Sequence, residues 1–221
     1  MKKIPLRLTF PILFLILLEG CSSSKQSITI DPNLEEKYKT ALKSFNSEWQ
    51  SIAAEFDTNE GLNGNGPALI KHFSIDTLNL KQIVVPNYLK NLAVSKQDIL
   101  ITNGTLEQGI LTIRISTIFG NQFITHIIKD KKISTSFREY YKYDKILKLS
   151  AGDSLSNEIN IPLSIKELSL STDNFELGKL VYGHCQFETE PYFLKSLDLD
   201  GQLLLLKRSY DYYFRFAPNK F

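Results

Sequence analysis

The sequence predicts a mostly β (α+β) fold: an antiparallel β-sandwich or barrel with one long N-terminal amphipathic helix. Two observations support this prediction. Apolar residues recur every three or four positions over 32–56, the period of a helix, and at every second position in many segments of 68–216, the period of a strand. Turn-forming residues separate these later segments at short intervals, which suits about eight to ten strands in a sandwich or a barrel.

Composition and charge exclude several classes of protein. The 221 residues are 43% hydrophobic and 23% charged, which is typical of a globular protein and not of a disordered or fibrous one. Residues 1–20 carry three basic side chains and one acidic side chain, so the other 201 residues hold 23 of each sign. This balance argues against a nucleic-acid partner, because such binding depends on neutralising phosphates. We expect a single globular domain over 32–221.

Residues 1–20 have the organisation of a signal peptide. Lys2, Lys3 and Arg7 precede an apolar run of 11 residues that covers 8–18. A membrane-spanning helix needs about 20 apolar residues, so this run suits a cleaved signal peptide better than a permanent anchor.

The segment Leu18-Glu19-Gly20-Cys21 resembles the lipobox of bacterial lipoproteins, with an aliphatic residue three positions before the cysteine and a small residue directly before it. Glu19 stands where that family usually has a small or uncharged residue. The resemblance covers residues 1–21 alone. It implies cleavage before Cys21 and acylation of its thiol, which would supply the two or more chains that stable membrane anchoring needs.

The resemblance also implies a location and a tether. Residues 21–31 would form a lipidated flexible tether, since a polar Ser-rich stretch follows the cysteine. Ser22 replaces the acidic residue that retains such proteins in the inner membrane of enteric bacteria. The implied location is the outer membrane, with the protein facing the periplasm.

The state expected for Cys185 depends on whether Cys21 is acylated. If Cys21 is acylated, Cys185 has no partner in the chain and is expected to be a buried small hydrophobe. If Cys21 is unmodified, a Cys21–Cys185 disulfide is conceivable in an oxidising compartment.

The helix is expected over 32–56, because Asp31 is a good N-cap and Pro32 is favoured at the first helical position. Its apolar stripe is expected to face the core, with a two-helix coiled coil as the lesser alternative. The stripe contains Leu34, Tyr38, Leu42, Phe45, Trp49, Ile52, Ala53 and Phe56.

Strands are expected along most of the remaining chain. The clearest are at 110–119, 122–129, 133–142, 146–150, 161–171 and 180–189, with a last long strand after Gly201, and shorter ones at 68–74, 80–85 and 98–102. Turns are expected at Gly120-Asn121 and at 130–132. The last strand alternates between two faces. One face carries Leu204, Leu206, Tyr210, Tyr212, Phe214 and Phe216, and the other carries Lys207, Ser209, Asp211, Tyr213 and Arg215.

Metal and cofactor sites are not expected. The histidines His72, His126 and His184 have no metal-ligand spacing, and His184 and Cys185 are strand neighbours that point to opposite faces. The segment 198–201 lacks the glycine and glutamate positions of a calcium loop and is expected to be a hairpin turn.

Catalytic motifs are equally scarce. No nucleophile motif is present, and Ser154 and Ser156 lie in an ordinary polar stretch. Glu188 and Glu190 would share a strand face about 7 Å apart and could act as acid and base on a glycoside. Pro191 beside them favours a strand end with two solvated acids instead.

The charged residues are unevenly distributed. Residues 129–148 have a net charge of +4 and residues 173–200 a net charge of −4. The basic segment also contains tyrosines, so it could bind anionic lipid headgroups or a glycan. The simpler interpretation is two solvated strand faces of opposite sign that are neighbours in the sheet.

These observations predict a lipid-anchored envelope protein that is a non-enzymatic module binding a ligand or an envelope protein. Two alternatives stay open. One is an envelope glycan-processing enzyme that uses Glu188 and Glu190, and the other is a carrier of lipid or another apolar ligand with a β-barrel cavity.

Overall fold

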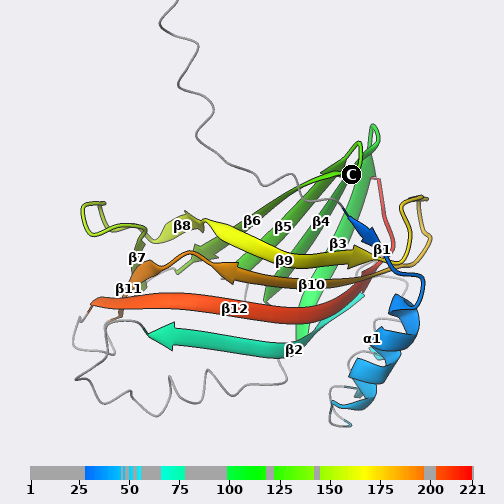
Figure 1. The fold of residues 1–221 in the computed structure, drawn as a ribbon, viewed down its shortest axis with the longest axis horizontal. Helices are drawn as coiled ribbons and strands as arrows, with labels where there is room; N and C mark the ends of the chain where they lie inside the picture. Colours follow the sequence, from blue (N-terminus) through cyan, green and yellow to red (C-terminus); the bar gives the residue numbers. More distant parts are fainter. Residues whose placement is uncertain are drawn as a thin grey trace, which may run out of the picture.

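The described part of the chain forms a mostly β fold with the helix α1 beside it in a computed structural model (Figure 1). The structure describes residues 28–45, 47, 50–51, 54–55, 66–77, 99–117, 122–141, 145–196 and 203–220. The helix α1 is Leu34–Lys43. The strands are β1 Thr29–Ile30, β2 Gly66–Thr77, β3 Ile99–Glu107, β4 Ile110–Thr117, β5 Gln122–Lys129, β6 Lys132–Tyr140, β7 Lys145–Lys148, β8 Glu158–Ile161, β9 Leu163–Leu170, β10 Val181–Thr189, β11 Tyr192–Ser196 and β12 Leu203–Phe216.

The strands belong to one large mixed sheet. Its hydrogen-bonded order is β1-β9-β10-β12-β2-β3-β4-β5-β6-β8, and β11 joins β12 to β7. The pairs between these strands are antiparallel except for β1 with β9, which is parallel. The order does not return to its first strand, so the sheet is not closed and the expected barrel does not form.

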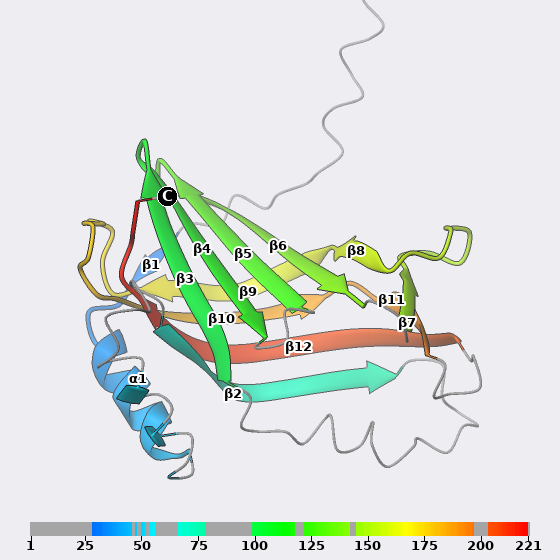
Figure 2. The same cartoon turned by 180° about the vertical axis from the view of Figure 1, so that it is seen from behind.

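Pro162 lies between the two strands, β8 and β9, that belong to opposite ends of this open sheet. It separates β8, which pairs with β6, from β9, which pairs with β10. Proline has no N–H to donate, and its carbonyl oxygen accepts a hydrogen bond from the backbone N–H of Glu190 at 2.7 Å. Beyond Pro162, β6 and β9 diverge, as Figures 1 and 2 show from opposite sides.

The sheet folds over itself to enclose the core. Strands β3–β6 fan across one face of β9, β10 and β12 (Figures 1 and 2). Ring contacts join the two layers: the centroids of Phe137 and Phe187 are 5.8 Å apart, and those of His126 and Phe214 are 6.2 Å apart. The core therefore lies between the layers and is filled by aromatic and aliphatic side chains.

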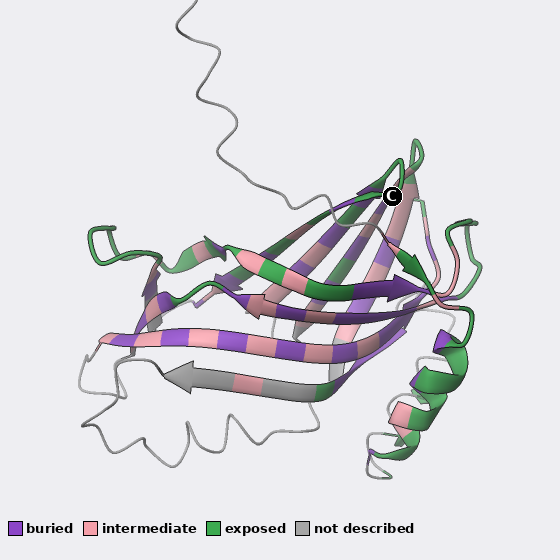
Figure 3. Ribbon diagram, in the orientation of Figure 1, coloured by how far each residue is buried: buried purple, intermediate pink, exposed green. Residues whose placement is uncertain are grey.

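The alternation predicted for the last strand is confirmed in β12, where buried and half-buried residues alternate over most of its length (Figure 3). The six predicted inward residues are buried. Packing of these rings requires glycine on β10, which is paired with β12, and on β3. A Cβ atom added at Gly183 would lie 2.1 Å from the ring of Phe214, and one at Gly104 would lie 2.1 Å from the ring of Phe216.

The prediction of one continuous helix over 32–56 is wrong. α1 ends at Lys43, and the side chain of Ser44 donates a hydrogen bond to the carbonyl oxygen of Ala41 at 2.6 Å. Such side-chain bonds compete with the helix for its carbonyl groups. The side chain of Gln50 donates to the carbonyl oxygen of Phe45 at 2.6 Å. Of the later predicted helix, residues 47, 50, 51, 54 and 55 are described and are helical.

Other boundaries also differ from the prediction. The strand expected at 161–171 corresponds to β9, β3 extends to Glu107, and the prediction contained neither β8, which ends at Ile161, nor β11. The turn at 130–132 is confirmed: Asp130 and Lys131 have φ values of 50° and 61°, as a tight hairpin turn requires. β1 lies inside the expected tether, so Thr29 and Ile30 belong to the sheet. The segments expected at 80–85, 120–121 and 198–201 lie outside the described residues.

Candidate functional site

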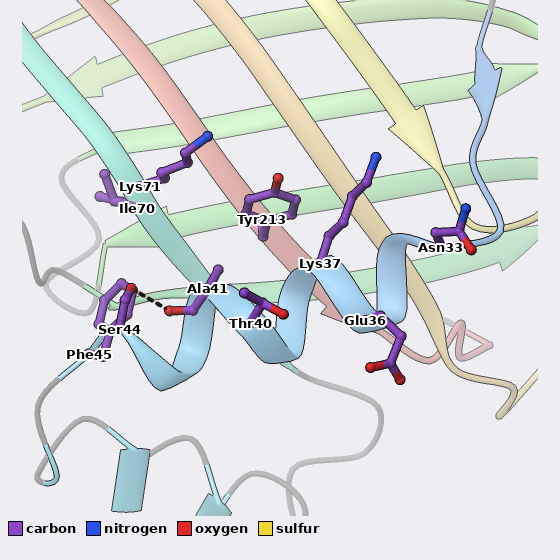
Figure 4. A pocket seen from close by; sticks show the side chains of 10 residues that line it. All are labelled: Asn33, Glu36, Lys37, Thr40, Ala41, Ser44, Phe45, Ile70, Lys71 and Tyr213. Atoms are coloured by element: carbon purple, nitrogen blue, oxygen red, sulfur yellow. Dashed lines mark hydrogen bonds between the residues drawn. The ribbon is translucent and has the colours of Figure 1, made fainter.

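A groove lies where α1 packs against the sheet. The buried side of α1 contacts the faces of β2, β10 and β12 that point away from the core. Tyr38 meets the ring of Tyr182 edge-on at 5.5 Å, and Leu69 is buried beside them. The groove beside this contact has a volume of about 830 Å³. Its lining residues are Asn33, Glu36, Lys37, Thr40, Ala41, Ser44, Phe45, Ile70, Lys71 and Tyr213 (Figure 4).

Two lysines and a tyrosine give the groove its character. Lys37 comes from α1, Lys71 from β2 and Tyr213 from β12 (Figure 4). Lys37 pairs with Asp31 at 2.6 Å and Lys71 with Asp211 at 3.6 Å, yet the two lysine side chains are 54% and 57% exposed. The partner carboxylates of Asp31 and Asp211 are 20% and 15% exposed, so the lysine is the more exposed member of each pair.

A charged cluster stands behind Tyr213. The ring of His184 stacks on that of Tyr213, with 4.5 Å between centroids. Its Nε2 lies 2.7 Å from Oδ1 of Asp211, and its Nδ1 lies 3.3 Å from Oε1 of Glu167. Burial by itself would lower the pKa of His184, but the hydrogen bonds and charges of Asp211 and Glu167 outweigh burial and raise it. The cluster therefore favours an imidazolium that holds Tyr213 in place.

This cluster has no nucleophile in position. The hydroxyl of Ser169 donates to Oε1 of Glu167 at 2.9 Å and not to His184. The Nε2 atom of His184 faces Asp211. The histidine thus lies between two carboxylates, without the serine–histidine contact that acyl transfer requires. No group of three or more His, Cys, Asp or Glu side chains in the described part of the chain is arranged to hold a metal ion.

The second polar cluster is buried between the two layers. The carboxylate of Glu139 on β6 is fully buried and accepts hydrogen bonds from Arg208 at 2.6 Å, Tyr192 at 2.6 Å and Tyr141 at 2.5 Å. Arg208 also donates from its Nε to the Tyr192 hydroxyl. Burial raises the pKa of both tyrosines. All four side chains of this cluster are buried, and their hydrogen bonds join β6 to β12. We therefore assign the cluster a structural role. No pattern considered in the sequence predicted this cluster.

Glu188 and Glu190 do not form the paired site considered from the sequence. β10 ends at Thr189 between them, and Glu190 is exposed. The Glu188 carboxylate lies beside the ammonium groups of Lys166 and Lys207, the latter at 2.9 Å. These hydrogen bonds lower the pKa of Glu188, whereas a general acid needs a raised pKa. The expected strand end is present and Glu190 is solvated, but Glu188 is ion-paired and not the second solvated acid that was expected.

Other residues singled out in the sequence lie apart from the groove. Cys185 is buried in the core, and burial raises its pKa to about 12, so it is the small hydrophobe expected. His184 and Cys185 do point to opposite faces. Ser156 donates to the carbonyl oxygen of Glu158 in an exposed turn. Cys21, the segment 198–201 and the side chain of His72 lie outside what the structure describes.

The basic and acidic segments meet at one end of the molecule. Lys131, in the turn between β5 and β6, pairs with Asp173 at 2.9 Å. Tyr141 of the basic segment is buried against Glu139 and is not available to a lipid or glycan. This contact supports the interpretation of neighbouring surfaces with opposite charge.

Comparison of the chain with protein-family models, curated proteins and solved structures found no match. Within the described ranges, no helix has the length and apolar character needed to cross a membrane. The geometry of the groove is therefore the main guide to function.

Proposed function

We propose that this protein is a lipid-anchored module of the bacterial envelope that binds an anionic ligand in the groove between α1 and the sheet. The anchor is supported by the lipobox-like segment ending at Cys21. The observation that carries the ligand site is the row of Lys37, Tyr213 and Lys71 along a groove of about 830 Å³. That volume is within the usual range for small-molecule sites, about 300–1,000 Å³.

The lining favours a ligand with two chemical parts. Lys37 and Lys71 suit a negatively charged group, and the Phe45 and Ala41 side chains suit an apolar or ring-shaped part. The ring of Tyr213 separates the two lysines along the groove. An anionic amphiphile or an acidic envelope glycan has this combination of charge and apolar surface.

Within this proposal the fold is a two-layer β-sandwich whose outer face, and not its interior, binds the ligand. Buried aromatic and aliphatic side chains pack together between the layers, and this arrangement gives the carrier hypothesis no support. The ion-paired Glu188 gives no support to the glycan-processing hypothesis. A binding module is the function best supported by the described geometry.

Filling the groove should abolish binding of an anionic aromatic probe. Thr40 lines the groove and is exposed, so Thr40→Trp places a large ring there without disturbing the buried side of α1. In calorimetric titration with anilinonaphthalene sulfonate, we expect one saturable site in the unmodified protein. We expect binding at least about tenfold weaker in Thr40→Trp, a loss of about 1.4 kcal/mol.

The matched control is Lys39→Trp, at the neighbouring exposed position of α1 that does not line the groove. It should bind the probe as the unmodified protein does. Equal weakening by both variants, or no saturable binding to the unmodified protein, would show that the groove is not the site.

A further inference from the structure

One end of the molecule carries a group of exposed apolar side chains. Ile30, Leu177 and Leu180 are 42%, 47% and 45% exposed. Ile30 is in β1, and the two leucines are in the loop 171–180 that joins β9 to β10. That loop lies at one extreme of the long axis, and the loop 149–157 lies at the other (Figure 1).

Strand pairing places Ile30 and the loop 171–180 at the same end of the sheet. Ile30 is paired with Leu170 at the end of β9, and the backbone N–H of Asp31 donates to the carbonyl oxygen of Leu170 at 2.9 Å. The loop begins at the next residue, where the N–H of Ser171 donates to the carbonyl oxygen of Tyr182 at 2.9 Å. Leu180 directly precedes β10, which β9 separates from β1, so Leu180 and Ile30 lie at the same end of the sheet.

The N-terminal segment enters the fold at this end. Seven residue steps separate Cys21 from Ile28, and a fully extended chain of this length spans at most about 24 Å. If Cys21 is held in a bilayer, as the proposed function requires, β1 cannot move farther from the membrane than this reach. The opposite end of the molecule has no such constraint.

We propose that Ile30, Leu177 and Leu180 form a membrane-contact surface that docks this end of the domain on the lipid bilayer to which Cys21 is anchored. Transfer of an exposed leucine side chain from water into the interfacial region of a bilayer is favourable, because it removes apolar surface from water. Among the charged side chains at this end, Lys131 pairs with Asp173 and Lys179 with Glu176 at 3.3 Å. In this proposal the apolar side chains carry the contact, so it should form on a bilayer without anionic lipid.

Tryptophan quenching can test this orientation. Leu177 and Leu155 are leucines of nearly equal exposure, 47% and 45%, in loops at opposite ends of the molecule. Each would be replaced by Trp in a Trp49→Phe background, because Trp49 is the chain's single tryptophan. The chain from Cys21 onward would be coupled through that thiol to a maleimide lipid in vesicles of brominated phosphatidylcholine. Cys185 is buried and should not react.

We expect the fluorescence of Leu177→Trp to fall about twofold or more on brominated vesicles, and that of Leu155→Trp to stay unchanged. Equal quenching at both ends, or none at Leu177→Trp, would overturn the proposal. Concentration-dependent shielding of Leu177→Trp without vesicles would assign the surface to a second copy instead. Hydrogen exchange of the coupled protein with native side chains should show protection over 171–180 and none over 149–157.

Chemical coupling separates this test from that of the natural anchor. If the bacterium does not acylate Cys21, the coupled protein still reports whether its leucines enter the bilayer. If Cys21 is acylated but the leucines stay in water, the anchor stands and the docking proposal fails.

Discussion

Replacement of Glu139 by Gln is expected to lower the free energy of unfolding by about 3–5 kcal/mol. The Glu139 carboxylate is fully buried and accepts hydrogen bonds from Arg208, Tyr192 and Tyr141. Gln has nearly the same shape, but it leaves the guanidinium of Arg208 as an uncompensated charge between the two layers. Urea denaturation followed by circular dichroism would measure the loss.

Two further variants make this test specific. Glu158→Gln removes an exposed ion pair with Arg138, whose side chains are 48% and 44% exposed, and should cost less than about 1 kcal/mol. The double variant Glu139→Gln/Arg208→Met removes the buried charge and should recover part of the loss. Similar small costs for Glu139→Gln and Glu158→Gln would contradict the structural role given to the buried cluster.

Acidification from pH 6.5 to 4 should destabilise the protein by about 3 kcal/mol through His126 alone. His126 is fully buried between Thr135, at 2.8 Å from its Nδ1, and Tyr212, at 2.9 Å from its Nε2. Burial lowers its pKa from 6.5 to about 4. Between these two values the unfolded chain binds a proton that the native protein does not, so the free energy of unfolding decreases as the pH falls.

The matched variant is His126→Gln, which keeps a polar side chain and does not titrate. Its own stability should be lower, but its free energy of unfolding should lack the fall between pH 6.5 and 4. His184 acts in another window, because its pKa is raised. The stability that protonated His184 contributes is complete below pH 6.5, and it is lost as the pH rises through the raised pKa of the native protein. Parallel pH profiles for the unmodified protein and His126→Gln would contradict the assignment.

Local patterns predicted the parts of the fold that depend on local geometry. The alternation of β12 follows from strand geometry, because successive side chains point to opposite faces, and it correctly placed Tyr212 in the core and Asp211 outside. The turn at 130–132 was predictable from its position between two alternating segments, and the burial of Cys185 from the lack of a partner cysteine once Cys21 is acylated. The end of α1 was not, because the bond from Ser44 to Ala41 competes with a stripe that continues beyond it.

Non-local partnerships had no such signal. Arg208 and Glu139 both occupy inward positions of their strands, yet they are 69 residues apart in the chain. Only the sheet topology shows that each supplies the charge that the other needs. The groove likewise combines residues of α1 with Ile70 and Lys71 of β2 and with Tyr213 of β12. One feature of the sequence does indicate a buried charge: Arg208 stands among apolar residues on the inward face of β12.

The proposed function depends first on the lipid anchor at Cys21. The most direct test is the mass of the N-terminal peptide of the protein extracted from membranes, compared with that of a Cys21→Ala variant. We predict a peptide that begins at Cys21 and carries a diacylglyceryl group, and a variant that is neither acylated nor cleaved at this position. An unmodified Cys21, or a peptide that retains residues 1–20, would contradict the lipid-anchored module.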